Sequence, residues 1–190
     1  METIRKIWNK TWEKYFENYK VMGVFEKILL SIIFSILTGL SAQIYIKIPF
    51  TPVPITFQTF VVLLSGILLG KNFGCLSQIL YFTAGVSGIG WFYGGSFGIL
   101  RPTTGYLVGF IFASYIAGYF SERKNKILGM ILASLIIYFL GIIWLKIFLK
   151  TETKNLLLIG VLPFIPFDIL KAIMAGIFAE KIRGKEDEKV

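Results

Sequence analysis

One acidic and one basic side chain lie together inside an apolar stretch near the C-terminal end of the chain. Asp168 is followed three residues later by Lys171, a spacing that places both on one face of a helix. A charge at the centre of a helix in lipid costs about 2.5–3.5 kcal/mol, so it usually faces a cavity or a partner. The two could form a mutual ion pair that tolerates its position, or bracket the polar group of a ligand. We favour the ligand site, because Pro163 and Pro166 precede the pair.

Two short motifs resemble enzyme signatures, and both are incomplete. Gly85-Val-Ser-Gly88 resembles the signature of rhomboid intramembrane proteases, but that nucleophile needs a histidine base and the chain has no histidine. The segment 66–72 resembles a phosphate-binding loop, but its glycine spacing is wrong and Asn72 stands where a magnesium-binding Ser or Thr belongs. A single buried carboxylate provides no acid–base pair and no metal site. We therefore predict that the chain is not an enzyme, does not hydrolyse ATP, and has no cofactor and no metal.

The elements that position Asp168 and Lys171 are predicted to be membrane helices. Of 190 residues, 55% are hydrophobic and 16% charged, and the mean hydropathy is +0.71, too apolar for a soluble domain of this size. Several apolar stretches reach the roughly 17–25 residues that cross a bilayer. We predict an all-α integral membrane protein, a six-transmembrane-helix bundle with proline-rich extracytoplasmic loops. The helices are expected at residues 25–46, 55–70, 72–87, 103–120, 126–148 and 165–182.

The basic residues indicate how the chain crosses the membrane. The net charge is +9, but the lysines and arginines lie between apolar runs and not on one face of a soluble domain, which disfavours nucleic acid as a partner. More than twice as many belong to the side of the N-terminus, Lys71, the loop 123–126 and the C-terminal tail as to the opposite side. By the positive-inside rule, both termini are expected to be cytoplasmic.

Aromatic and basic residues recur at helical spacing before the first apolar run. We divide the chain into an amphipathic cytoplasmic interfacial helix at 1–22, a six-helix membrane domain at 23–183 and a charged cytoplasmic tail at 184–190. A docking surface for a partner protein is the alternative role of residues 1–22.

The six prolines fall in three connections, which the predicted topology places together on the extracytoplasmic side. They are Pro49, Pro52 and Pro54, then Pro102, then Pro163 and Pro166. Proline disfavours helix in the residue before it, so the apolar run 48–55 is expected to be extended. Non-helical apolar backbone at membrane depth is tolerated where it is buried in protein or lines a cavity. We therefore predict a pocket closed by these loops; simple helix termination is the alternative.

Two stripes of small residues predict close helix packing. Gly105, Gly109, Ala113 and Ala117 follow each other at intervals of four residues, and we assign them to packing inside the bundle. A second stripe, in the first membrane helix, is equally compatible with packing and with docking to another membrane subunit, and we take it as the candidate docking face. It consists of Ser31, Ser35 and Gly39.

Several motifs, in the same order along the chain, resemble those of the BioY family, the biotin-binding S components of energy-coupling factor (ECF) transporters. The resemblance covers about residues 40–179 and rests on segments 48–58, 66–70, 81–95, 102–110 and 162–172. The first reads Ile-Pro-Phe-Thr-Pro-Val-Pro-Ile-Thr-Phe-Gln and the last contains Pro-Phe-Asp-Ile-Leu-Lys-Ala. The resemblance implies six membrane helices that hold biotin near the extracytoplasmic surface, under the loops between helices.

The family's motifs point to specific positions of this chain. The Asp and Lys of the last motif match Asp168 and Lys171, and a polar residue of the glycine-rich segment falls at Ser96, where some relatives carry Asn. This chain departs from the pattern at two positions. Leu107 stands where some relatives have Arg, and Phe167 stands where the family usually has Gly.

The chemistry of these residues fits biotin, whose ureido ring has N–H donors beside a carbonyl acceptor. We expect Asp168 to accept hydrogen bonds from the ureido N–H groups and Lys171 to donate to the ureido oxygen; Lys171 could instead pair with the carboxylate of the tail. Gln58 could add a polar contact. Aromatic residues that could form apolar walls are Tyr45, Phe50, Phe57, Trp91 and Tyr93.

The resemblance also implies partners, because the chain has no ATPase motif. These are a membrane coupling subunit and two ATPase subunits. The expected function is that of a high-affinity biotin-binding subunit in the cell membrane, which captures biotin on the extracytoplasmic side for ATP-driven uptake. The alternatives are an S component for another small vitamin and a membrane scaffold protein without a ligand.

Overall fold

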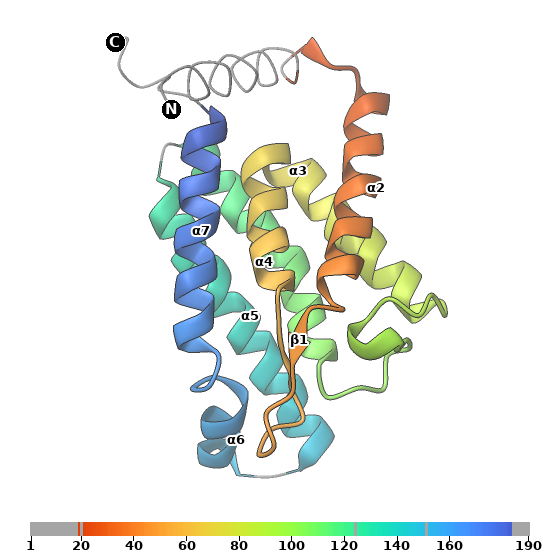
Figure 1. Ribbon diagram of the computed structural model, residues 1–190, viewed down its shortest axis with the longest axis vertical. Helices are drawn as coiled ribbons and strands as arrows, with labels where there is room; N and C mark the ends of the chain where they lie inside the picture. Colours follow the sequence, from red (N-terminus) through yellow and green to blue (C-terminus); the bar gives the residue numbers. More distant parts are fainter. Residues whose placement is uncertain (1–18, 20, 124, 151, 184–190) are drawn as a thin grey trace.

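The computed structural model describes residues 19, 21–123, 125–150 and 152–183 (Figure 1). The predicted tail at 184–190 lies outside the described residues. So does the predicted interfacial helix at 1–22, except for residues 19, 21 and 22.

The described part of the chain is built mainly from helices. These are α2 (Val24–Ser41), α3 (Gln58–Val86), α4 (Thr104–Glu122), α5 (Lys126–Leu149), α6 (Thr153–Gly160) and α7 (Ile165–Arg183). Helices α2, α3, α4 and α5 are each long and apolar enough to cross a membrane, and α6 with α7 passes the same test as a pair bent by 47°. The prediction of an all-α membrane protein is therefore confirmed.

Helix α3 is a hairpin of two antiparallel halves, which correspond to the two predicted helices at 55–70 and 72–87. Gly70 has φ +70° and ψ 176° and interrupts the helical conformation, in a region that glycine adopts without steric cost. After this turn the second half of α3 runs back beside the first half. Two hydrogen bonds show this arrangement: Gln58 bonds Tyr81, and Ser65 accepts a hydrogen bond from Gln78. The break that the sequence predicts between residues 70 and 72 is confirmed.

The first membrane helix ends earlier than predicted. Helix α2 stops at Ser41, whereas the apolar run predicted a helix to residue 46. Tyr45–Ile46 instead forms strand β1, which pairs antiparallel with β2 (Ile55–Thr56), Tyr45 opposite Thr56. The pairing gives the backbone N–H and C=O groups of the two strands hydrogen-bond partners. The prolines between the strands have no N–H group with which to do so.

The prolines lie near one end of the bundle. Pro49, Pro52 and Pro54 lie between β1 and β2, in backbone that is not helical, as predicted for residues 48–55. Pro102 precedes α4, and Pro163 lies between α6 and α7. Pro166 was expected in a connection but lies in the first turn of α7, where proline is tolerated because those N–H groups have no intrahelical acceptor.

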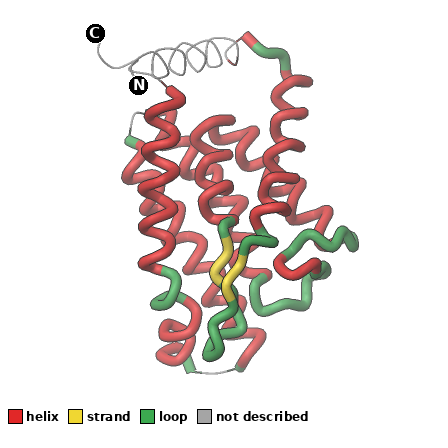
Figure 2. The backbone as a smooth tube through the Cα atoms, viewed as in Figure 1, coloured by secondary structure: helices red, strands yellow, loops and turns green. Residues whose placement is uncertain are grey.

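The two ends of the bundle differ in construction (Figures 1 and 2). The β1–β2 hairpin, the 3₁₀ turn η1 (Tyr93–Gly95) and the unpredicted helix α6 lie toward one end, which we call the loop end. The turn of α3, the start of α2 and the C-terminal end of α7 lie at the other, which we call the turn end.

At the turn end, helix backbones are in direct contact. A Cβ atom on Gly66 would lie 2.2 Å from the backbone oxygen of Ser114, and one on Gly118 would lie 2.4 Å from the backbone nitrogen of Lys71. Ser65 and Ser114 share a hydrogen bond of 2.9 Å across the same contact. The two halves of α3 and helix α4 are therefore packed with no space for another methyl group.

Helix α4 also packs closely against α5. A Cβ on Gly105 would lie 2.4 Å from the backbone oxygen of Leu140, and one on Gly109 would lie 2.9 Å from the Cα of Ile137. The prediction that this small-residue stripe packs inside the bundle is confirmed.

Candidate functional site

A closed hydrogen-bond network joins Asp168 and Lys171 to two other helices. The Nζ of Lys171 donates to Oδ1 of Asp168 at 2.8 Å and to Oγ1 of Thr59 at 3.0 Å. The hydroxyl of Thr59 donates in turn to Oδ1 of Asp168 at 3.0 Å, and Tyr138 donates to Oδ2 at 2.6 Å. Both carboxylate oxygens therefore have donors, and the ammonium has two acceptors.

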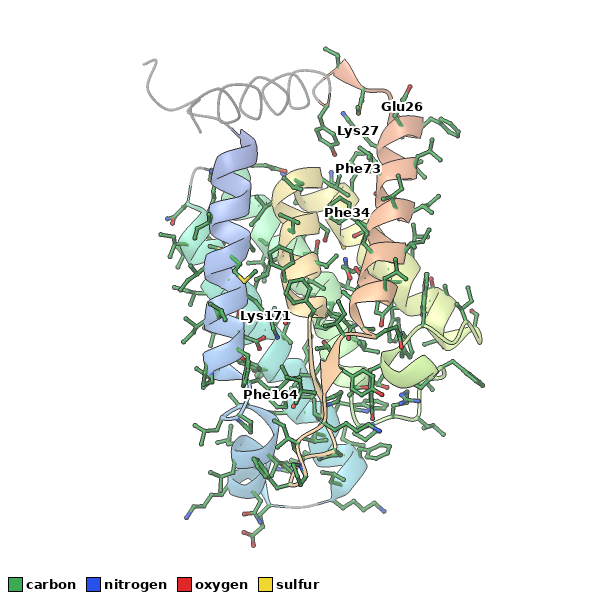
Figure 3. The ribbon with its side chains drawn as sticks, in the orientation of Figure 1. Glu26, Lys27, Phe34, Phe73, Phe164 and Lys171 are labelled. Atoms are coloured by element: carbon green, nitrogen blue, oxygen red, sulfur yellow. The ribbon has the colours of Figure 1, made fainter. Side chains whose placement is uncertain are left out.

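Three helices position this network. Asp168 and Lys171 lie one turn apart on α7, Thr59 is the second residue of α3, and Tyr138 lies in the middle of α5. Asp168 and Lys171 are only 9% and 7% exposed, although both carry charge. Lys171 and, before it, Phe164 extend from α7 and its N-terminal connection toward the centre of the bundle (Figure 3). The predicted common face of Asp168 and Lys171 is confirmed by their direct ion pair.

The network borders a small cavity near the loop end. Its volume is about 50 Å³, room for one or two water molecules, whereas pockets for small ligands measure about 300–1,000 Å³. A ligand of biotin's size therefore enters only if the walls move. Residues that line the cavity include Val53, Pro54, Ile55, Thr56, Gln58, Thr59, Phe92, Tyr93, Thr103, Tyr106, Leu107, Phe110, Ile137, Tyr138, Phe164, Asp168 and Lys171.

Gln58 lines the cavity, as the sequence predicted, and its side chain is held on two sides. Its Nε2 donates to the hydroxyl of Tyr81 at 2.6 Å, and its Oε1 accepts from Thr56 at 3.2 Å. Tyr93 also lines the cavity. The structure therefore brings together Asp168, Lys171, Gln58 and Tyr93 of the nine predicted ligand-binding residues.

Three predicted wall residues are not among those that line the cavity. Tyr45 packs edge-on against Tyr93, with ring centroids 5.7 Å apart. Phe57 packs against Phe60, and Phe50, in the β1–β2 connection, is 65% exposed.

Trp91 and Ser96 support the segment around η1. The indole of Trp91 donates to the backbone oxygen of Tyr81 at 3.0 Å, and the hydroxyl of Ser96 donates to the backbone oxygen of Tyr93 at 2.6 Å. Both side chains stabilise the loop that brings Phe92 and Tyr93 to the cavity. Phe92 packs there against Gly85, whose Cβ would lie 2.2 Å from the phenyl ring, so this glycine of the protease-like motif has a packing role.

Sequence reasoning missed Thr59 and Tyr138, which complete the network. Thr59 directly follows Gln58, the last residue of the first family motif, so its place in the sequence could have identified it as a site residue. Tyr138 lies in an apolar helix with no motif around it and could not have been distinguished from other membrane tyrosines.

The small-residue stripe of α2 lies inside the bundle. Ser31 and Ser35 are 0% and 2% exposed, and Ser31 donates to the backbone oxygen of Phe73 at 2.9 Å. A Cβ on Gly39 would lie 3.0 Å from the indole ring of Trp91. This placement favours the packing alternative over docking for Ser31, Ser35 and Gly39.

The site offers recognition chemistry and no reactive group. It combines one carboxylate, one ammonium, several hydroxyls and an amide, and among the described residues no three Cys, Asp or Glu side chains group together to hold a metal ion. Such a set can hold a ligand that carries both donors and acceptors.

Replacing Tyr138 with Phe tests the network. The change removes the 2.6 Å hydrogen bond to Asp168, and a hydrogen bond to a charged group contributes about 1.5–3 kcal/mol. We expect the midpoint of thermal unfolding in detergent to fall by roughly 3–10 °C. Tyr115→Phe, at a 42% exposed position, is the matched control. Equal midpoints for the two variants would mean that the bond adds no stability.

Known proteins with similar sequences are biotin transporters of one family. The BioY family model matches residues 13–187. The probable biotin transporter BioY of Pyrococcus horikoshii is 41% identical over 162 residues, which cover 84% of this chain and 97% of the relative. The biotin transporter BioY of Thermotoga maritima is 33% identical over 152 residues, which cover 76% and 89%.

A solved structure has the same fold. It is a crystal structure described as the S-component for biotin from an ECF-type ABC transporter, with a TM-score of 0.75 and 24% sequence identity over 85% of this chain and 94% of that one. From the family match and the relatives together, the chain belongs to the BioY family.

Proposed function

We propose that this chain is the biotin-binding subunit of an ECF-type vitamin importer. The observation that carries the proposal is the buried Asp168–Lys171 pair at a cavity between α3, α5 and α7. Relatives that share the family are named biotin transporters, and the similar solved structure is described as a biotin S-component.

The polar groups of the network match the ureido ring of biotin. Asp168 accepts hydrogen bonds from the ureido N–H groups, and Lys171 donates to the ureido oxygen. In the structure both side chains bond to each other and to Thr59, so ligand binding exchanges bonds within the protein for bonds to the ligand. Gln58 and Tyr93 border the remainder of the ligand.

The loop end is where the ligand enters. Residues 53–56 of the β1–β2 hairpin and residues 92–93 at the start of η1 form part of the cavity wall, and both belong to short segments and not to long helices. Displacing them enlarges the cavity without breaking a membrane helix. In the topology predicted from the basic residues, this end faces away from the cytoplasm and both termini are cytoplasmic.

Uptake requires other subunits, since the chain is a transporter component and not an enzyme. A membrane coupling subunit and two ATPase subunits supply the energy of ATP hydrolysis in this proposal. The chain itself captures biotin.

Calorimetry of the purified protein in detergent tests the proposal. We expect biotin to bind with one-to-one stoichiometry, and thiamine and riboflavin, which have different ring donors and acceptors, to give no heat of binding. A folded protein that binds another vitamin and not biotin would make the chain an S component for that vitamin. A folded protein that binds none of them would favour the scaffold alternative.

A further inference from the structure

The charges on α7 leave the acidic end of a ligand without a partner. Asp168 and Lys171 neutralise each other, and the ammonium already donates to both Asp168 and Thr59. Biotin carries one carboxylate, which is ionised at neutral pH. If α7 holds the ureido ring, as proposed above, the carboxylate needs a cation or free donors elsewhere on the cavity wall.

One such donor is the hydroxyl of Thr103, on the segment that leads into α4. Thr103 lines the cavity and is 6% exposed, and its Oγ1 has no hydrogen-bond partner among the described residues. A threonine directly before a helix commonly bonds an N–H group of the first turn, but Thr103 makes no such bond. A buried, unpaired hydroxyl is unfavourable unless it has another use.

The second donor is Arg101, two residues earlier. Its Nε is buried and has no partner within the described part of the chain. The guanidinium carbon lies 5.3 Å from the ring centroid of Tyr93, and Tyr93 lines the cavity. The backbone around it is fixed, because the oxygen of Arg101 accepts from the indole of Trp144 at 2.7 Å.

The helix that follows adds to the attraction. Thr103 directly precedes α4, a helix of 19 residues, so the positive end of the helix dipole lies beside Thr103. The unpaired hydroxyl of Thr103 and the guanidinium of Arg101 thus lie close to the start of α4, beside the part of the wall that Thr103 and Tyr93 form.

We propose that the carboxylate of the ligand is bound at the start of α4, by the hydroxyl of Thr103 and the guanidinium of Arg101. This inference rests on the proposed function, and it assigns Lys171 to the ureido ring and not to the carboxylate.

The test compares biotin with biotinamide, in which the carboxylate is replaced by a neutral carboxamide. Affinities of both ligands are measured by calorimetry for the wild type, Arg101→Gln, Thr103→Val and Lys171→Ala. Arg101→Gln and Thr103→Val are expected to weaken biotin binding about tenfold or more while changing biotinamide binding less than about threefold. Thr103→Ser, which keeps the hydroxyl, is expected to bind biotin like the wild type. Lys47→Gln, an exposed charge on the β1–β2 hairpin, is the matched control and is expected to leave both affinities unchanged.

The outcomes separate the inference from the proposed function. Equal affinity of the wild type for the two ligands, or equal losses for both in Arg101→Gln, would overturn the inference and leave biotin as the ligand. A loss confined to biotin in Lys171→Ala, with Arg101→Gln unchanged, would move the carboxylate to Lys171. A folded wild type that binds neither ligand would overturn the proposed function itself.

Discussion

Lys171→Met is expected to abolish measurable biotin binding. The substitution keeps the length and apolar character of the side chain but removes the ammonium that bonds Asp168 and Thr59. Removing one partner of a buried ion pair costs about 3–5 kcal/mol, because the remaining charge has lost its counterion. If that cost falls on binding, the affinity drops by a factor of roughly 100 or more. Calorimetry with biotin measures the loss, and Lys154→Met, at an exposed position on α6, is the control.

A second variant separates binding from folding. In Asp168→Asn/Lys171→Met no charge is left at the site, so we expect thermal stability to recover toward that of the wild type while binding remains absent. Asp168→Asn alone is expected to weaken binding at least tenfold, because one ureido acceptor becomes a donor. Wild-type affinity in Lys171→Met would remove Lys171 from the ligand site.

Gly66→Ala is expected to have the largest effect on folding. The added methyl group would meet the backbone oxygen of Ser114 at 2.2 Å, and backbone cannot rotate away as a flexible side chain can. The two halves of α3 and helix α4 would have to separate, at a cost of about 3 kcal/mol or more. Size-exclusion chromatography and thermal unfolding in detergent measure the result, which we expect to be aggregation or a strongly lowered midpoint.

Gly176→Ala provides the matched control, because it is the same substitution in another helix. Its methyl group would approach the flexible end of Met130 at 3.2 Å, which can move. If Gly66→Ala and Gly176→Ala unfolded at the same temperature, the backbone contact between α3 and α4 would not limit stability.

The sequence predicted the long helices well, and its errors have physical reasons. Apolar runs located the membrane helices, and Lys71 between two of these runs marked the turn of α3. The run that contains α2 remains apolar to residue 46, so hydropathy could not show that the helix stops at Ser41 and that Tyr45–Ile46 pairs as a strand. Helix α6 has only eight residues and begins among charged ones, which gives it no membrane signal.

Some residues of the candidate site could also be predicted from the sequence, and others could not. Asp168 and Lys171 could be found because charge in an apolar helix is rare, and Gln58 because it ends a family motif. The aromatic residues were harder, since the direction of a side chain in an irregular loop follows no period; Tyr93 lines the cavity, but Tyr45 does not. Hydrogen bonds across helices, such as the one from Tyr138 to Asp168, depend on tertiary packing that one sequence does not display.

The contrast between the two ends of the bundle determines where the molecule can deform. At the turn end, Gly66 and Gly118 bring backbones into contact, so a displacement there meets steric resistance at once. At the loop end, the cavity wall includes connections that carry few regular backbone hydrogen bonds. The turn end is therefore the rigid part of the bundle, and the loop end is the part that can deform. A change in the cavity wall is expected to move the loops while the helices keep their arrangement.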